Sequence, residues 1–142
     1  MLALLAALAA PFSVSDTTDN DTGQRTVWAL QIDQDLDRLS FLHLKCIDRK
    51  PTVELELYGF NAPDWAVVTL GGGDAADTPF IFERVPDRRD ELRFHGDARI
   101  LVNQLQEDSI RQFTVHSPLG NRSASFDMDG LTRAWQRVVA AC

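Results

Sequence analysis

The sequence has little of what marks a membrane-embedded or nucleic-acid-binding protein. Its apolar opening, residues 1–10, is far shorter than the roughly 20 residues that a helix needs to cross a bilayer. Fourteen Lys and Arg residues stand against twenty-one Asp and Glu residues, which gives a net charge of −7 at pH 7. Because nucleic acid and anionic membrane surfaces both select basic patches, neither is expected to be the main partner.

The usual patterns of metal ligands and nucleophiles are also missing. The three histidines, His43, His95 and His116, lie far apart in the sequence and show no His-x-His or His-Glu-x-x-His spacing. No Gly-x-Ser-x-Gly elbow occurs, and no pair stands out among the many carboxylates. We therefore expect no catalytic, cofactor-binding or metal-binding residues, no cofactor and no enzymatic activity.

Two loops share part of a ligand-binding motif. Carboxylates alternate over Asp33–Asp37 as at the start of a calcium loop, but Arg38 stands where that loop needs glycine and Leu44 where it needs glutamate. The triplet Gly71–Gly73 lacks the Gly-Lys-Ser/Thr ending of a phosphate-binding loop. A solvated acidic loop and a flexible hairpin loop are the favoured interpretations.

Only two cysteines are present, and both fall in apolar patterns. Cys46 lies in the strand-like stretch FLHLKCID, and Cys142 ends the last helical stripe. We predict one disulfide between Cys46 and Cys142, which ties the closing helix to the sheet; two buried free thiols are the alternative. In the chain-entropy model, such a bridge contributes on the order of 4–5 kcal/mol.

The first ten residues resemble the apolar region of a secretory signal, with a small-x-small pattern at Ala7–Ala9. No Lys or Arg precedes them, which departs from a standard signal, and a short helix packed on the domain is the alternative. Export favours an oxidising compartment, and we expect the periplasm. The polar residues 11–25 are expected to form a flexible arm before a single domain over residues 26–142.

Strand patterns dominate this domain. Residues 40–48 and 52–60 predict an antiparallel hairpin, with Leu42, Leu44 and Cys46 on one face and Lys45 opposing glutamates on the other. The same period predicts strands over residues 26–33, 65–70, 80–85, 91–95, 110–116 and 123–128.

Two helices complete the prediction. One is expected from its cap Asp97 to about Glu107, with Ile100, Leu101 and Leu105 on its core side. Asp129 is expected to cap the second, with Gly130 giving the turn its conformational freedom. This helix carries an apolar stripe of Leu131, Ala134, Trp135, Val138, Val139 and Cys142. The predicted fold class is therefore α+β, with about seven short antiparallel strands, a mid-chain helix and a C-terminal helix.

The order of these segments resembles a known family. A tryptophan-bearing strand is followed by a strand ending Leu-x-Cys, a glutamate-bearing strand and an aromatic-Arg strand; Phe-Asp-x-x-Gly-Leu-x-x-Ala then leads to the last cysteine. This order resembles the type VI secretion-associated VasI (TagM-like) family of exported bacterial proteins. The matching positions are Leu44, Cys46, Glu54, Leu55, Phe82, Arg84, Leu101, Leu105, Phe126, Asp127, Gly130, Leu131, Ala134 and Cys142.

The resemblance implies an accessory protein of the cell envelope with one disulfide and no catalytic residues. The leading hypothesis is a periplasmic adaptor that binds a secretion component through a sheet edge or an exposed strand face. The alternative is a periplasmic inhibitor or immunity protein for a cell-wall hydrolase, since a small acidic protein suits a basic cleft. An enzyme of unknown type is the third hypothesis.

Overall fold

The computed structural model describes residues 11–33, 35, 38–71 and 78–142. Within these residues the chain forms one nine-stranded sheet and two helices. The elements are β1 (Ser13–Thr18), β2 (Arg25–Ile32), β3 (Ser40–Ile47), β4 (Lys50–Leu57), β5 (Trp65–Gly71), β6 (Pro79–Arg84), β7 (Glu91–Phe94), α2 (Ala98–Leu105), β8 (Ile110–His116), β9 (Arg122–Asp127) and α3 (Leu131–Ala140). No helix among the described residues is long and apolar enough to cross a membrane.

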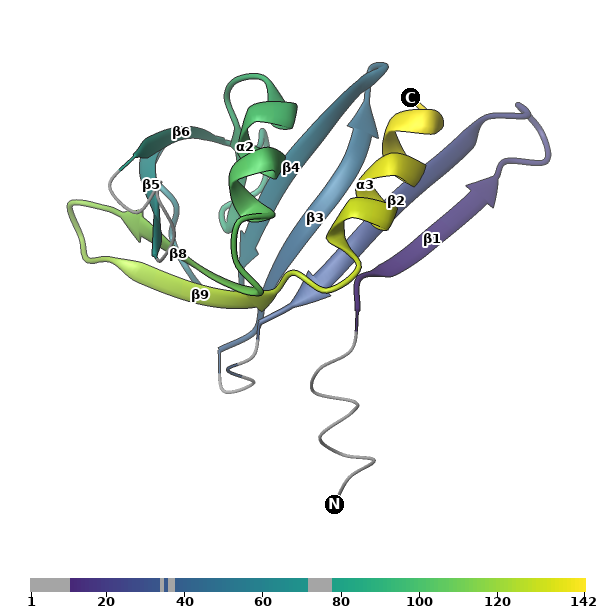
Figure 1. The fold of residues 1–142 in the computed structure, drawn as a ribbon. Helices are drawn as coiled ribbons and strands as arrows, with labels where there is room; N and C mark the ends of the chain where they lie inside the picture. The colour runs from purple at the N-terminus through teal and green to yellow at the C-terminus, as the bar shows by residue number, and fades with distance from the viewer. Residues whose placement is uncertain (1–10, 34, 36–37, 72–77) are drawn as a thin grey trace.

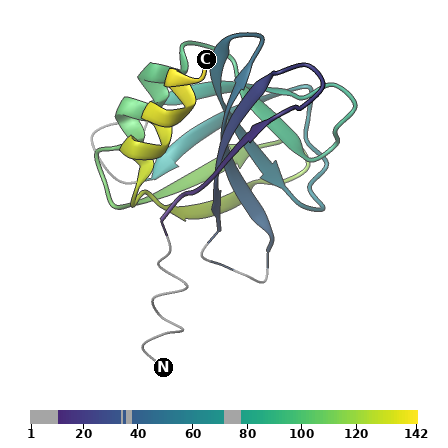
Figure 2. The same cartoon turned by 90° about the vertical axis from the view of Figure 1, so that its right-hand side faces the viewer.

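All paired strands are antiparallel, in the spatial order β1-β2-β3-β4-β7-β6-β5-β8-β9. The sheet is strongly curved, and both helices lie on its concave side (Figures 1 and 2). We call this the inner face and the helix-free side the outer face. The β1–β2 hairpin extends beyond α3 at one end of the molecule (Figure 1).

The alternation of side chains explains where the core lies. In β3 and β4, Leu42 pairs with Leu55 and Leu44 with Val53, and all four side chains are fully buried. These residues share the inner face because successive side chains of a strand point to opposite sides. The predicted hairpin and its inward residues are therefore confirmed.

The mid-chain helix begins as predicted and ends earlier. The side chain of Asp97 caps α2 by accepting a hydrogen bond from the backbone N–H of Arg99 at 3.0 Å. Leu101 and Leu105 are buried, but Ile100 is 57% exposed, so its expected place in the core is wrong. Ile100 lies outside the core because the buried face of α2 is narrow; it consists of Ala98, Leu101, Val102 and Leu105.

The cap predicted for the closing helix is also wrong. Gly130, not Asp129, is the N-cap of α3, with φ 78° and no side-chain hydrogen bond. A left-handed residue at this point favours glycine, so the turn is made by backbone freedom rather than by a carboxylate. The apolar stripe is confirmed at Leu131, Ala134 and Val138, which are buried; Val139 is partly exposed at the surface.

The predicted disulfide is confirmed. Cys46 and Cys142 are joined with an S–S distance of 2.05 Å and a Cα–Cα distance of 5.5 Å. The bridge ties the end of β3 to the residue that follows the last turn of α3. It therefore closes a covalent ring through most of the sheet and both helices.

The segment before residue 26 differs from expectation. Residues predicted to form a loosely held arm instead form β1 and the start of β2, and the sheet has nine strands where about seven were expected. Phe12 is buried in the core at 7% exposure. The signal-like residues 1–10 and most of the triplet Gly71–Gly73 lie outside the described residues.

Candidate interaction surface

The two edges of the sheet differ in how their backbone groups are satisfied. At the β9 edge, Asp33 accepts a hydrogen bond from the N–H of Ser125 at 3.3 Å. Beside it, the side-chain amide of Gln31 donates to the carbonyl of Asp127 at 2.9 Å. Side chains from the β2 end of the sheet therefore occupy two of the backbone groups that a further strand would use at β9, the N–H of Ser125 and the carbonyl of Asp127.

Asp33 is well suited to this sealing role. Its carboxylate is buried, and burial raises its pKa above the ordinary value, while hydrogen bonds from the backbone N–H groups of Asp35 and Ser125 oppose that rise. Both backbone N–H groups donate to the same carboxylate oxygen, Oδ1, which therefore links the 33–35 turn to β9.

Among the described residues, no such cover lies along most of the β1 edge. At the hairpin turn, the N–H of Asp19 donates to the carbonyl of Gln24 at 2.8 Å. Hydrogen-bonded pairs in an antiparallel ladder alternate, so Thr17, Ser15 and Ser13 face β2 with their backbone groups. The backbone N–H and C=O groups of Val14, Asp16 and Thr18 therefore point away from β2, towards the open side.

One contact marks where this open edge begins. Phe12, two residues before Val14, donates its N–H to the carbonyl of Asp129 at 3.2 Å. The chain just before α3 thus occupies the place of a neighbouring strand at Phe12. Beyond that point, no other described residue bonds the outward backbone groups of β1, which are the groups that an added strand would use.

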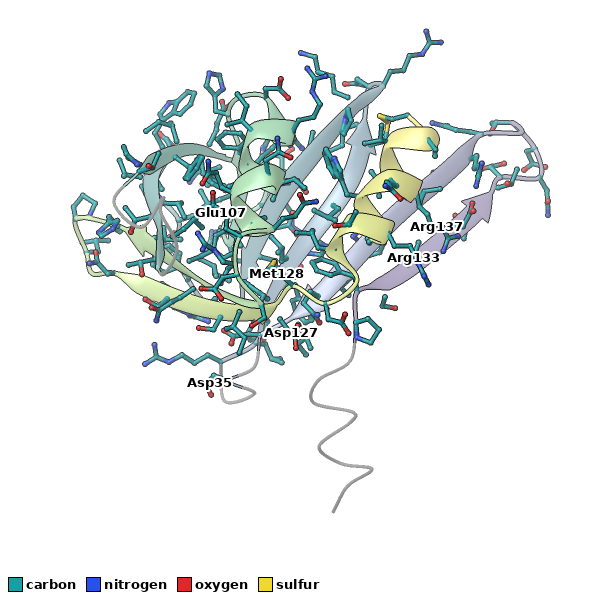
Figure 3. The ribbon with its side chains drawn as sticks, viewed as in Figure 1. Asp35, Glu107, Asp127, Met128, Arg133 and Arg137 are labelled. Carbon is teal, nitrogen blue, oxygen red and sulfur yellow. A yellow bond between two sulfur atoms is a disulfide. The ribbon has the colours of Figure 1, made fainter. Side chains whose placement is uncertain are left out.

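A groove of about 700 Å³ lies between the start of β1 and α3. Its apolar lining includes Phe12, Val14 and Ala134, and its polar lining includes Arg133 and Arg137. Figure 3 shows the two arginines on the flank of α3 that faces β1. They are four residues apart, one helical turn, so they project from the same side of α3.

The charges along the groove are unevenly paired. Arg25 donates two hydrogen bonds to the Asp16 carboxylate, at 2.9 and 2.7 Å. These bonds are the main reason that the pKa of Asp16 lies below its ordinary value. Arg137 reaches the same carboxylate only at 3.5 Å. Arg133 is exposed, and the described part of the chain supplies no ion pair for it.

The outer face carries a second feature, a network of buried charges. Glu54 is fully buried, with Lys45 at 2.6 Å from one carboxylate oxygen and Arg93 at 2.7 Å from the other. The predicted pairing of Lys45 with a glutamate row is thus confirmed. Because both cations are held by one carboxylate, this network is suited to fixing the sheet rather than to binding an anion.

His43, a predicted strand histidine, is part of the same face. The indole N–H of Trp28 donates to His43 Nδ1 at 2.9 Å, and His43 Nε2 lies 3.3 Å from Glu56. The imidazole therefore carries its proton on Nε2. Burial, aided by Lys45, lowers the pKa of His43 to about 4, so it stays neutral at physiological pH. It is held as a structural link rather than poised as a base.

The other aromatic and histidine side chains do not form one site. Trp65 contacts His95 with ring centroids 5.0 Å apart, while His116 bonds Thr69 at 2.9 Å. Trp135 packs against the core, as expected. Among the described residues, no three His, Cys, Asp or Glu side chains gather closely enough to hold a metal.

Sequence reasoning missed the β1 edge. The signal was present in the stretch SVSDTT, where three of the six residues over Ser13–Thr18, Val14, Thr17 and Thr18, are β-branched. We interpreted its polarity as a loop, but a strand that is solvated on both faces has the same composition. Its pairing with β2 is a long-range property that the composition of the segment does not show.

Comparison with known proteins gave no relative. No family model matches the chain, and neither a curated protein nor a solved structure matches it. The assignment of function therefore rests on the geometry described above.

Proposed function

We propose that this protein is an exported accessory protein of the cell envelope that acts by binding another protein. The binding site is the free edge of β1, which accepts a strand from the partner. The observation that carries the proposal is a contrast between the two edges of one sheet: side chains bond Ser125 and Asp127 of β9, whereas the described residues supply no partner for the outward backbone groups of Val14, Asp16 and Thr18 on β1. A natural protein that covers one edge and leaves the other bare exposes a template for strand addition.

Export to the periplasm is part of the proposal. The disulfide between Cys46 and Cys142 suits an oxidising compartment, and the apolar stretch at residues 1–10 suits a leader. The resemblance to VasI-like proteins adds the finer proposal that the partner belongs to a type VI secretion apparatus.

The test is a position-specific crosslink in intact cells that express the full chain. A photoreactive amino acid replaces Thr17, whose exposed side chain lies on β1, and a control carries it at Leu119, which is 87% exposed in the turn between β8 and β9. We expect one protein to be captured from Thr17 and not from Leu119. Equal capture from both positions would contradict the proposal.

A pair of proline variants tests the backbone directly. Thr18→Pro removes an outward N–H and should abolish the crosslink while the fold is kept, because an edge strand tolerates proline on its open side. Thr17→Pro removes an N–H that faces β2 and should lower the melting temperature. If the captured protein is a peptidoglycan hydrolase rather than a secretion component, the inhibitor hypothesis replaces the adaptor role.

A further inference from the structure

We infer that the strand accepted by β1 carries a large aromatic side chain that packs on Trp28, on the outer face of the sheet. This inference rests on the proposed function, because it names the chemistry of the partner at the same edge. Three observations lead to it: the shortness of the free edge, the exposed apolar side chains of β2, and the small side chains of β1 that lie between the two.

The free edge of β1 is short for a specific complex. Its outward backbone groups belong to Val14, Asp16 and Thr18, so an added strand pairs with β1 only over residues 14–18. A specific protein interface usually takes about 20–30 residues from each partner. A partner that pairs with β1 therefore needs further contact surface next to that strand.

The two faces of the β1–β2 hairpin offer different surfaces for this contact. On the inner face, the Asp16 carboxylate already forms an ion pair with Arg25 at 2.7 Å. On the outer face, Trp28 and Ile32 of β2 are 38% and 41% exposed, with the half-buried Leu30 between them. Because a contiguous row of exposed apolar side chains marks an interaction surface, we expect the added contact on the outer face.

The register places small side chains between this apolar row and the free edge. Ser13 pairs with Leu30 and Ser15 pairs with Trp28, so the serines share the outer face with their partners. Neighbouring strands lie about 4.8 Å apart, so an added strand runs about 10 Å from β2. Only a large side chain can span that distance, and Ser15 is too short to obstruct it. An aromatic residue opposite Ser15 can therefore meet Trp28 above the serine.

Trp28 is held in place for such a contact. Its indole N–H donates to His43 Nδ1 at 2.9 Å, and its ring stacks on the imidazole with ring centroids 5.3 Å apart. Lys45 Nζ lies 5.9 Å from the centroid of the same ring. A side chain that is already fixed loses little conformational freedom when a partner covers it, and aromatic pairs add to the gain from burial. Trp28 is therefore suited to anchor an aromatic side chain.

A second copy of the chain is a poor occupant of the same edge. In the antiparallel pairing that the rest of the sheet uses, its β1 strand would present Ser13, Ser15 and Thr17 on the outer face. None of these side chains is long enough to reach Trp28. The inferred occupant is therefore a different protein with a bulkier strand.

The probes are two synthetic seven-residue peptides made of threonine, with phenylalanine at the centre of one and serine at the centre of the other. Each is titrated into the oxidised protein and followed in ¹⁵N-correlated NMR spectra. The backbone amide signals of Val14, Asp16 and Thr18 report strand addition, and the indole N–H signal of Trp28 reports the aromatic contact. We expect the phenylalanine peptide to shift all four signals and to bind about tenfold more tightly than the serine peptide.

The variant Ser15→Gln fills the space above Ser15 and keeps the outward backbone groups of β1. It should weaken binding of the phenylalanine peptide about fivefold, and it should leave binding of the serine peptide unchanged. The matched control Thr26→Gln adds the same side chain to β2, two residues before Trp28. It should leave the affinity for both peptides unchanged.

The outcomes separate this inference from the proposed function. If both peptides shift the β1 amides with equal affinity and the Trp28 signal does not move, the aromatic preference is wrong and strand addition stands. If neither peptide shifts the β1 amides, both ideas fail. A dimer in sedimentation experiments that Thr18→Pro dissociates would make a second copy the occupant and overturn the inference.

Discussion

Glu54 and Arg111 are both fully buried charged side chains, but the protein treats them in opposite ways. Glu54, on the outer face of β4, has a cation within 2.7 Å of each carboxylate oxygen. Arg111, on β8, faces inward with Phe113 and pairs across the ladder with Phe126. Within the described residues, none of its three guanidinium nitrogens has a hydrogen-bond partner.

The difference shows that the face of the sheet decides whether a buried charge is compensated. On the outer face, neighbouring strands place Lys45 and Arg93 beside Glu54, and both cations stay partly in contact with water. On the inner face, the ladder partner of Arg111 on β9 is Phe126, which lacks the carboxylate that a guanidinium needs. A buried charge without a partner costs several kcal/mol, so, with no partner among the described residues, Arg111 is expected to lower the stability of the fold.

The largest effect is expected when Glu54, like Arg111, is left buried without an ion-pair partner. The double variant Lys45→Met, Arg93→Met leaves Glu54 buried and unpaired, and should lower the free energy of unfolding by about 3–5 kcal/mol. Urea denaturation measures the loss. The triple variant that adds Glu54→Leu should recover most of it, and a double variant with wild-type stability would contradict the network described here.

His43 sharpens the comparison, because it is buried without charge. Its pKa lies at about 4 in the folded protein against an ordinary value of 6.5. Between these pH values His43 is protonated in the unfolded chain and neutral in the folded one. The free energy of unfolding therefore falls as the pH drops from 6.5 to 4. The loss should approach about 3 kcal/mol.

The matched variant for this measurement is His43→Gln. Burial raises the pKa values of Asp33 and Glu91, and their titration also changes stability near the acid end of this range. The difference between the wild-type and His43→Gln curves of stability against pH isolates the histidine. A flat difference curve would show that His43 ionises normally in the fold.

Replacing Arg111 tests the other side of the comparison. Arg111→Met keeps a long apolar side chain and removes the uncompensated charge, so the free energy of unfolding should rise by about 1–3 kcal/mol. Arg111→Lys, which keeps a buried charge, should give no such gain. A loss of stability in Arg111→Met, seen by thermal denaturation, would mean that the guanidinium contributes to the folded state.

The smallest effect is expected at an exposed ion pair. Arg84 and Asp64 lie 2.7 Å apart, but the Asp64 side chain is 78% exposed. Water screens such a pair, so Arg84→Gln should change the free energy of unfolding by less than about 0.5 kcal/mol. A change as large as that of the Lys45, Arg93 double variant would mean that burial is not what separates these pairs.

Local patterns predicted much of this fold. Alternation identified the β3–β4 hairpin with Lys45 beside the glutamates, and the apolar stripe of α3 placed Cys142 towards Cys46. These predictions succeeded because the period of the apolar residues, two in a strand and 3.6 in a helix, can be recognised within one short segment of the sequence. The α+β class followed from the same periods.

The interaction edge was not predictable by the same means. Whether β1 is a strand depends on β2, and whether the β9 edge is closed depends on Gln31 and Asp33, about ninety residues away in the chain. The N-cap of α3 failed for a related reason, since the backbone turn at Gly130 replaces a side-chain hydrogen bond. Tertiary context decides each of these features.

The disulfide also determines how the protein bears mechanical load. A force applied between Phe12 and Cys142 is transmitted along the backbone from Phe12 to Cys46 and then through the disulfide bond to Cys142. Only the stretch from Phe12 to Cys46, about 120 Å when fully extended, can lengthen, and it contains β1, β2 and most of β3. Tension would therefore peel away the interaction edge first and release a strand-bound partner, while the ring from Cys46 to Cys142 stays under no load and remains folded.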